Sequence, residues 1–498
     1  MIERTLVLDF LLYRPDFPMY TLVPSWVSIE MALLLQAVAI CLGLGWMWRW
    51  YRGHRPISAE SGATVQHLGP LLPSVVVVAL ILAFVYGLIP ILTYWQDGAT
   101  YRHHPDLRQE LATIVLAQIL AFVGLGCGYF GSKIWIGKDR FSTPSVATRP
   151  IISSGQAIVG LALLQLLVLA ELVYSSGGLA FLNPWSGVSI FHQVHKISGI
   201  KSLADTLMIL LMIAPISGVP RRWLGVFAVV FVSLALVEGV RYRVVILFLG
   251  WFILYGPKYW QWARPRVRVG LVMAVLAIGL MAQLWSANRW AIANKQYQYL
   301  SLNPVANGGG PISEFSQTYV GGAVLAFSNE QHLGLDYGAT SLGFVGIRFL
   351  PKPLLGAMGL TATEGSLSGK KPFPPMLNRV VHATSASGEY RKGVPAYGAM
   401  QEVFLSFGWW SVFVWLLVGL GFGLLGGLMR WILGSGSLAQ HYIQAIGIAF
   451  WFQWITRGYL PQQVELLLFL TLPCVVWLIS KSISNQNAPS TSPSSITT

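Results

Sequence analysis

The stretch LVEGVRYRVVILFLG, residues 236–250, decides how the centre of the chain folds. It places Glu238, Arg241 and Arg243 between two strongly apolar runs. One straight helix over residues 222–257, at about 1.5 Å per residue, would be roughly 54 Å long, whereas the hydrocarbon core of a bilayer is about 30 Å thick. In a lipid environment the run must therefore turn, and a glycine makes the motif EGVRYR the natural place for the turn.

The composition of the whole chain indicates that this environment is lipid. Of the 498 residues, 54% are hydrophobic and 10% are charged, and 20 are Trp. Runs of about 17 to 25 mostly apolar residues can each cross a bilayer as a helix. The chain is therefore predicted to be an all-α, polytopic integral membrane protein with about 11 transmembrane helices. The apolar runs lie at 27–48, 71–94, 111–132, 150–174, 203–219, 223–238, 243–256, 269–287, 400–429, 438–456 and 463–480.

The distribution of Lys and Arg predicts which side of the membrane each loop faces. The segments 49–69, 133–149, 220–222, 257–268 and 430–437 carry many basic residues and few acidic ones. The positive-inside rule makes this side cytoplasmic, in the cytoplasmic (inner) membrane, with the N-terminus outside and the C-terminus inside. The positive net charge is then mainly a signal for topology, and nucleic acid is not an expected partner.

This orientation divides the chain into five regions. Residues 1–26 form an extracytoplasmic N-terminal segment, and 27–287 hold the first eight membrane helices. Residues 288–398 form a large extracytoplasmic loop, whose short apolar pieces predict short helices folded over or back into the outer mouth of the bundle. Residues 399–482 hold the last three membrane helices. The tail, 483–498, has almost no large apolar residues and is predicted to be disordered in the cytoplasm.

The charged turn at EGVRYR admits two interpretations. In one, Glu238 and Arg241 form a helical surface pair worth a few tenths of a kcal/mol, while Arg243 extends to lipid headgroups. In the other, two guanidinium groups on an extended turn point the same way and hold a phosphate-bearing ligand. Because an Arg at the bilayer centre costs about 2.5–3.5 kcal/mol even on a mild scale, both arginines should lie at the outer interface or face a wet cavity.

The predicted outer loop adds further charges. GIRFLPKPLL places Arg348 and Lys352 around a Pro-bounded bend, and His382, the acidic Glu389 and several basic residues follow. For any single residue a solvated surface role is expected, but a net basic loop on this side favours an anionic partner. Glu402 then falls in the first turns of a membrane helix, where it either pairs with an arginine or belongs to a site.

Three motifs are EGVRYR between two central helices, RFLPKP in a large outer loop, and QEVFLSFGWW at the start of the following helix. Together they resemble Wzy-type oligosaccharide repeat-unit polymerases of O-antigen and exopolysaccharide synthesis. The resemblance runs from the sixth apolar run to the helix beginning near Tyr397. It implies a membrane glycosyltransferase that moves a glycan from a polyprenyl diphosphate, such as undecaprenyl diphosphate, onto another lipid-linked repeat unit at the outer face of the membrane.

The resemblance also implies roles for individual residues. A departing diphosphate needs preorganised positive charge, and the acceptor hydroxyl needs a base or hydrogen-bond acceptor. Substrate or diphosphate binding would fall to Arg241, Arg243, Arg348 and Lys352, with Glu238 orienting the arginines. Acceptor activation would fall to Glu402, Glu389 or His382. A chain-length regulator and a flippase are the protein partners that such an enzyme implies.

No metal or cofactor is expected. The sequence has no Asp-X-Asp motif for a Mg²⁺-bound nucleotide-sugar, which fits a donor carried on lipid. GFGLLG at 421–426 lies inside an apolar run rather than after a strand, so Gly419, Gly423 and Gly427 are predicted to allow close helix packing instead.

Three alternative functions remain open. A ligase that transfers the same lipid-linked glycan onto a lipid or protein acceptor would need the same cationic cleft. A flippase or exporter of lipid-linked oligosaccharide should show an internal repeat, which is not visible in the sequence. A structural component of a polysaccharide machine would need no catalytic residues.

Overall fold

The computed structural model describes a helical protein. It describes residues 20–53, 82–136, 153–175, 201–237, 240–262, 296–302, 316–349, 375–385, 396–433 and 438–471, together with isolated positions between these ranges. Within these ranges all regular secondary structure is helical, apart from one isolated bridge between Tyr101 and His104. The all-α prediction is confirmed for this part of the chain.

Most predicted apolar runs correspond to a helix. Because a helix satisfies its own backbone hydrogen bonds, it is the expected form of an apolar run. The run 71–94 is described from residue 82, and the run 463–480 up to residue 471; the run 269–287 lies almost entirely outside the described residues. The matching helices are α2 (Ile29–Gly53), η1 (Phe84–Leu88) with α4 (Ile89–Asp97), α5 (Arg108–Ile136), α6 (Ser154–Ser175), α7 (Lys201–Ile213), α8 (Arg221–Val237), α9 (Arg241–Trp262), α18 (Leu438–Arg457) and the helix 460–471.

The predicted single run 400–429 is interrupted in the structure. It forms α16 (Ala399–Phe407), a 3₁₀ turn η6 (Gly408–Trp410) and α17 (Ser411–Leu433). Gly408 has a φ of 57°, a left-handed conformation that favours glycine. Every residue of α16 except Phe407 is buried, whereas α17 exposes several large apolar side chains. The interruption therefore separates an interior helix from one that reaches the surface.

The segment 288–398 contains the short helices that were predicted for it. They are η4 (Tyr297–Tyr299), α12 (Gln317–Glu330), α13 (Ala339–Phe349) and α15 (Pro375–Thr384). The apolar piece VGGAVLAF belongs to α12, which is almost completely buried. The side of the membrane on which this segment lies stays a prediction.

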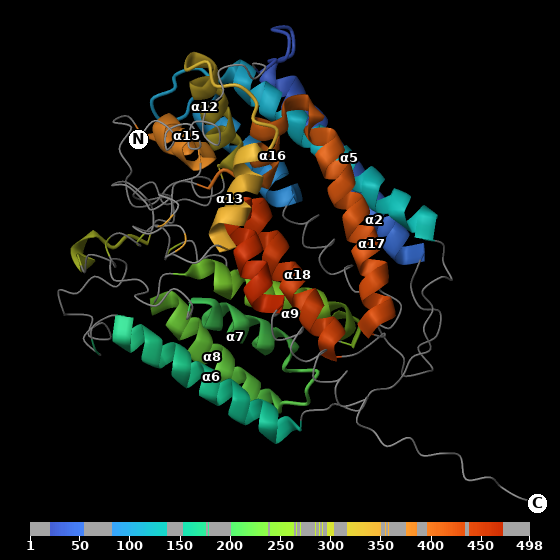
Figure 1. The fold of residues 1–498 in the computed structure, drawn as a ribbon, viewed down its shortest axis with the longest axis vertical. Helices are drawn as coiled ribbons and strands as arrows, with labels where there is room; N and C mark the ends of the chain where they lie inside the picture. The colour runs from blue at the N-terminus through green and yellow to red at the C-terminus, as the bar shows by residue number, and fades with distance from the viewer. Residues whose placement is uncertain are drawn as a thin grey trace, which may run out of the picture.

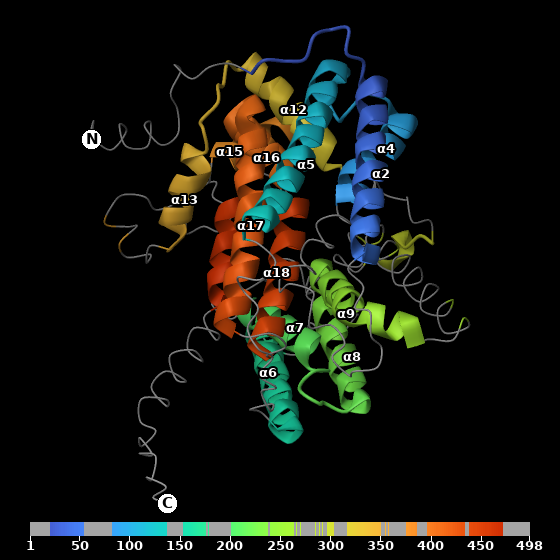
Figure 2. The same cartoon turned by 90° about the vertical axis from the view of Figure 1, so that its right-hand side faces the viewer.

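The helices pack in two groups that meet at α18 (Figure 1). Helices α6, α7, α8 and α9 form one group, and α7 and α9 also contact α18. Helices α2, α5, α12, α15, α16 and α17 form the other, with α12 and α15 at its far end. Figure 2 shows α17 and α18 running along the long axis of the molecule, between α12 and α15 at one end and α6 and α8 at the other.

The surface carries broad apolar areas. Three stretches of the described residues are long and apolar enough to cross a bilayer: Arg108–Ser132, Ser154–Tyr174 and Ala399–Gly426. Shorter apolar helices lie at Ile29–Gly45, Leu203–Ile213 and Tyr242–Tyr255. Exposed apolar surface of this extent is what a bilayer would cover. Exposed large apolar side chains lie along α6 (Val159, Leu163, Leu166, Leu167), α8 (Trp223, Val226, Val229) and α17 (Phe413, Leu417, Leu425).

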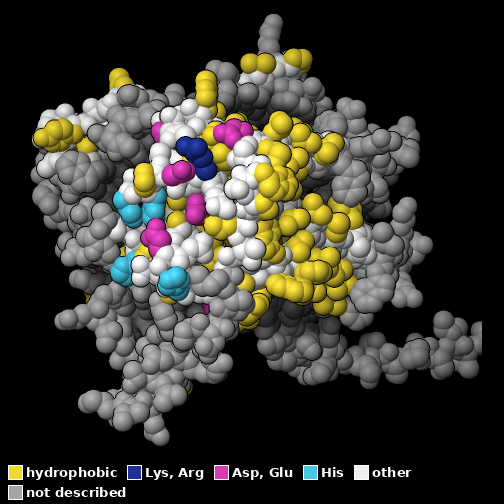
Figure 3. Space-filling model, turned by 90° about the horizontal axis from the view of Figure 1, so that it is seen from above, with side chains coloured by type: hydrophobic (Ala, Val, Ile, Leu, Met, Phe, Trp, Pro, Cys, Tyr) yellow, Lys and Arg dark blue, Asp and Glu magenta, His cyan; other side chains and the backbone are white. Residues whose placement is uncertain are grey.

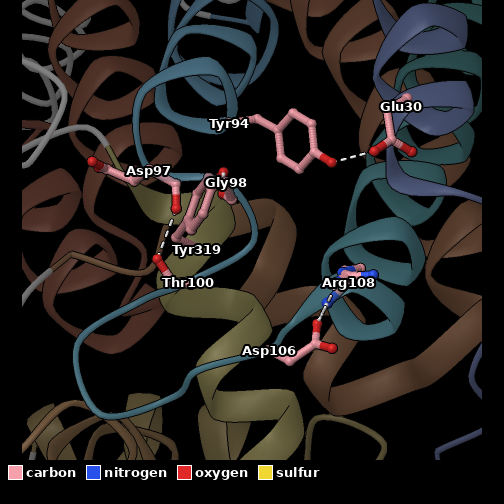
Figure 4. A network of polar contacts seen from close by, with 8 residues as sticks. All are labelled: Glu30, Tyr94, Asp97, Gly98, Thr100, Asp106, Arg108 and Tyr319. Atoms are coloured by element: carbon pink, nitrogen blue, oxygen red, sulfur yellow. Dashed lines mark hydrogen bonds and ion pairs between the residues drawn. The ribbon is translucent and has the colours of Figure 1, made fainter.

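Charged and histidine side chains gather at the end that carries α12 and α15. Viewed from this end, they lie beside a large apolar area (Figure 3). Polar contacts hold the elements together here (Figure 4). The Tyr94 hydroxyl of α4 donates to the Glu30 carboxylate of α2, and the Tyr319 hydroxyl of α12 donates to the Gly98 carbonyl at 2.7 Å. Figure 4 also shows the exposed Arg108–Asp106 ion pair, at 3.5 Å.

Helices α5 and α17 pack backbone against backbone along their length. A Cβ at Gly128 of α5 would overlap the carbonyl oxygen of Leu416, and a Cβ at Gly419 of α17 would overlap that of Leu125. A Cβ at Gly423 would overlap the Ser132 hydroxyl. The predicted role of Gly419 and Gly423 in close helix packing is confirmed; the surroundings of Gly427 lie outside the described residues.

Adding one methyl group at this contact should be strongly destabilising. We expect Gly128→Ala to lower the free energy of unfolding by about 1–3 kcal/mol or more, because the obstructing atom belongs to the backbone and cannot rotate away. The measurement is the midpoint of thermal unfolding of detergent-purified protein. Gly126→Ala, two residues away with open space around its Cβ, is the control and should be neutral or slightly stabilising. Equal effects of the two variants would contradict the packing.

Candidate functional site

The most unusual feature of the described chain is a helix break at residues 457–460. Helix α18 ends at Arg457, and the next helix begins at residue 460. Gly458 and Tyr459 between them have φ values of 67° and 60°. A non-glycine residue at positive φ is uncommon and persists only where its surroundings hold it. The break is therefore stabilised by other parts of the fold.

Side chains from distant parts of the chain satisfy the carbonyl groups at the end of α18. The Tyr86 hydroxyl donates to Ile455 O at 2.6 Å, and the Gln317 amide donates to Thr456 O at 2.8 Å. The last carbonyls of a helix have no partner within it, and in an apolar interior each would be costly to leave unpaired. These donors therefore allow α18 to end inside the protein.

The start of α16 lies directly against the break. A Cβ at Gly458 would come within 2.9 Å of Gly398 O and 3.0 Å of the Tyr397 ring. The amide of Glu402 bonds Gly398 O at 3.1 Å, within the first turn of α16. This close contact places Glu402 beside the break.

The Glu402 carboxylate binds the first turn of the helix that follows the break. Its Oε1 accepts hydrogen bonds from Leu460 N–H at 3.0 Å and from the Ser341 hydroxyl at 3.1 Å. Its Oε2 accepts from Leu460 N–H at 3.2 Å and from the Trp454 indole N–H at 3.4 Å. Glu402 is 3% exposed. A carboxylate at a helix N-terminus is favoured by the unpaired N–H groups and the helix dipole, so Glu402 is held rigidly by α13, α18 and helix 460–471.

A cationic cluster lies at the other side of the break. The guanidinium of Arg457 lies over the Tyr242 ring at 4.4 Å from its centroid, and that of Arg243 lies at 5.7 Å. Arg243 donates from Nε to Asp205 Oδ1 at 2.8 Å, and their side chains are 1% and 3% exposed. The Tyr242 hydroxyl donates to the same Asp205 oxygen at 3.3 Å. Arg457 is exposed, whereas Arg243 is buried.

The structure therefore brings two of the sequence-predicted site residues to opposite sides of one break. Glu402 bonds Leu460, and Arg243 shares the Tyr242 ring with Arg457. These residues come from α16, helix 460–471, α9 and α18, which are distant in the sequence.

The turn at EGVRYR is present, but Arg241 and Arg243 lie after it. Helix α8 ends at Val237 and α9 begins at Arg241, so the predicted turn between two helices is confirmed. The two arginines occupy the first turn of a helix, where positions two apart lie about 200° apart around the axis. The interpretation that needed an extended backbone, with both residues pointing the same way, does not fit this arrangement.

The other predicted site residues are described only in part. Glu238, Lys352 and Glu389 lie outside the described residues, and the side chains of Arg241 and Arg348 also lie outside them. His382 is exposed in the last turn of α15 and stacks on Phe327, with ring centroids 5.8 Å apart. Its roles, like theirs, stay predictions.

Sequence reasoning did not identify Asp205 or Arg457. The signal for Asp205 was an isolated acid in the otherwise apolar run DTLMILLMI, since buried carboxylates are usually paired. The signal for Arg457 was an Arg followed directly by Gly at the end of an apolar run, which is typical of a helix C-terminus.

Arg379, one of the basic residues of the 288–398 segment, has a structural role. It donates to the Tyr20 hydroxyl at 3.0 Å and to Gly334 O at 3.3 Å. Burial raises the pKa of Tyr20 to about 12, although the guanidinium of Arg379 acts in the opposite direction. The Tyr20 hydroxyl in turn donates to Leu405 O, so this contact attaches the chain before α2 to α15 and α16.

Comparison with known proteins adds no assignment. No family profile, curated protein or solved structure gives a significant match to the chain. Among the residues that the structure describes, no three His, Cys, Asp or Glu side chains gather as metal ligands.

Two substitutions should separate what the hydrogen bonds of Glu402 contribute to stability from what its charge contributes. We expect Glu402→Leu to lower the free energy of unfolding by at least about 2 kcal/mol, because each buried donor left unpaired costs about 1–3 kcal/mol. Glu402→Gln keeps an oxygen that can accept from Leu460 and should lose much less. Thermal unfolding of the purified variants is the measurement, with Glu330→Leu, at an exposed acid, as control. If Glu402→Leu were as stable as the parent protein, the carboxylate would not hold the break.

The Asp205–Arg243 pair should show strong coupling. We expect Asp205→Leu to lower the free energy of unfolding by about 3–5 kcal/mol, because it leaves a buried guanidinium without its counter-ion. The double variant with Arg243→Met should recover most of that stability, since replacing a buried pair by apolar residues is often neutral. A double-mutant cycle of thermal midpoints measures the coupling. Additive effects would show that the ion pair is not closed as described.

Proposed function

We propose that the protein is a membrane glycosyltransferase that polymerises polyprenyl-diphosphate-linked oligosaccharide repeat units for surface polysaccharide synthesis. One observation carries the proposal: a buried, rigidly held carboxylate and an arginine cluster lie on the two sides of the same helix break. Breaks of this kind within apolar helices occur where the polar backbone is buried in protein or lines a cavity, and they form binding sites in many membrane proteins.

The proposed reaction uses both sides of the break. The acceptor sugar hydroxyl attacks the anomeric carbon of the donor glycan, a new C–O bond forms, and the C–O bond to the diphosphate breaks with inversion. The lipid diphosphate leaves with the electron pair, and its negative charge is stabilised by guanidinium groups. The proton of the acceptor hydroxyl passes to a base.

Arg457 is the described residue best placed for the diphosphate. Its guanidinium is exposed, is held over Tyr242 and can donate in a planar fork to phosphate oxygens. Arg243 contacts the same Tyr242 ring, but Asp205 balances its charge, so its proposed contribution is to hold Tyr242 and Arg457 in place. Arg241, Arg348 and Lys352 remain proposed contributors, with Glu238 as their partner.

Glu402 is the proposed base. The donors from Leu460, Ser341 and Trp454 keep its carboxylate in one position, which is the preorganisation that proton transfer requires. Glu389 and His382 remain proposed alternatives.

The proposed location is the cytoplasmic membrane, with the N-terminus and the break outside and the C-terminus inside. In this topology the turn around 239–242 and the segment 457–462 also lie outside, and contacts among the outer segments support it. Arg457 of the segment 457–462 lies over Tyr242, and Gln317 of the segment 288–398 bonds Thr456. A flippase would supply the lipid-linked substrate, and a chain-length regulator would limit the product.

The test is an in vitro polymerisation assay. Purified protein incubated with a lipid-linked oligosaccharide should give a ladder of longer chains. We expect Arg457→Ala to slow ladder formation by about 10²–10³-fold, as the loss of one donor to a developing charge does. Glu402→Gln should slow it by about 10²–10⁴-fold, the usual contribution of a general base.

Controls make the assay specific. Arg222→Ala removes an exposed arginine from α8, which is predicted to lie at the cytoplasmic end, and should leave the rate unchanged. Arg457→Lys keeps the charge but loses the planar fork, so its rate should be intermediate. Transfer to an unrelated acceptor without a ladder would indicate a ligase. Movement of labelled lipid between leaflets without transfer would indicate a flippase and overturn the proposal.

A further inference from the structure

Four side-chain amide atoms at the helix break are buried without a hydrogen-bond partner. They are Oε1 of Gln317, Oε1 of Gln463, and both Oε1 and Nε2 of Gln401. All three residues are at least nine-tenths buried. Buried polar atoms in proteins are almost always hydrogen-bonded, either to the protein or to ordered water.

The three amides surround the same backbone. The Gln317 Nε2 donates to Thr456 O at 2.8 Å, and the Gln463 Nε2 lies 3.5 Å from Gly458 O. A Cβ at Gly398 would lie 2.8 Å from the Gln401 Oε1, and Gly398 itself lies against Gly458. The amides therefore come from α12, α16 and helix 460–471 and meet at the point where α18 is interrupted.

The unpaired atoms include acceptors on every one of the three side chains and a donor on one of them. The amide N–H groups of Gln317 and Gln463 donate to Thr456 O and Gly458 O, which leaves the oxygen of each amide without a donor. Small neutral hydroxyl molecules, which both donate and accept, match this set. Because an unpaired amide in an apolar interior is unfavourable, three of them at one position without a ligand would be costly to the fold.

We propose that Gln317, Gln401 and Gln463 form a site for ordered water at the helix break, enclosed by α12, α16 and helix 460–471. The waters complete the hydrogen bonds of the amides and belong to the folded structure. The water site does not rest on the proposed function.

The first test detects the water directly. Synchrotron X-ray radiolysis generates hydroxyl radicals from bound water, and these label adjacent side chains even where bulk solvent cannot reach. Tyr397 is buried with its ring against Gly458 and should be labelled in the purified full-length protein. Tyr442 is also buried, and its hydroxyl donates to Leu470 O at 2.9 Å, so it is the control and should not be labelled. Absence of labelling at Tyr397, or equal labelling of the two tyrosines, would overturn the proposal.

The second test uses the sign of a stability change. Gln401→Met keeps the shape of the side chain but removes its amide. If the amide binds water, the variant loses hydrogen bonds, and the midpoint of thermal unfolding should fall by several degrees with loss of Tyr397 labelling. Gln118→Met is the reference, because the Gln118 amide is bonded to Gln36 at 2.7 Å and to Thr318 at 3.1 Å and its loss should lower the midpoint similarly. A rise in the midpoint for Gln401→Met would show an unpaired amide and contradict the water site.

Neither test uses glycosyl transfer, so failure of the proposed function would leave the result intact. Conversely, if the protein polymerises the lipid-linked oligosaccharide but Tyr397 is not labelled, only the water site is overturned.

Discussion

The need to satisfy backbone hydrogen bonds at the interruption of α18 governs this region of the structure. In an apolar environment, a helix can end only where its last carbonyls and the first N–H groups of the next helix find partners. Tyr86, Gln317 and Glu402 supply those partners from three separate parts of the chain. The packing of α16 against α18 and the hydrogen bond from α12 to its last turn meet this requirement.

The charges at the break have a common electrostatic explanation. Arg457 lies in the last turn of α18, and Glu402 lies at the first turn of the helix that follows, so each meets the end of a helix dipole that favours its sign. Arg457 and the Leu460 N–H that binds Glu402 are three residues apart, so the fixed backbone of the break holds the cation and the carboxylate apart. A structural role and a catalytic role for Glu402 are therefore compatible, because rigid placement serves both.

Much of the fold could be predicted from the sequence, and the site only in part. Apolar runs predicted α2, α5, α6, α8, α9 and α18 closely, because run length and helix length are both set by local composition. The interruption at Gly408 was not predicted, since a single glycine within a largely apolar run does not by itself indicate a break. In the structure a Cβ at Gly408 would lie 3.1 Å from Leu335. Glu402 was singled out because a charge within an apolar run is conspicuous. Asp205 was equally conspicuous, but its significance depends on Arg243, which is distant in the sequence.

The sequence by itself determined that the chain is helical, where most helices begin and end, and that charged residues interrupt the apolar runs at EGVRYR and at Glu402. These properties depend on residues close together in the chain. Only the tertiary structure decided that Arg243 faces Asp205, that Arg457 shares Tyr242 with it, and that Glu402 binds the backbone after α18. Partner choice depends on which helices pack together, and that packing is decided by close glycine contacts such as those between α5 and α17 and by buried hydrogen bonds between distant residues.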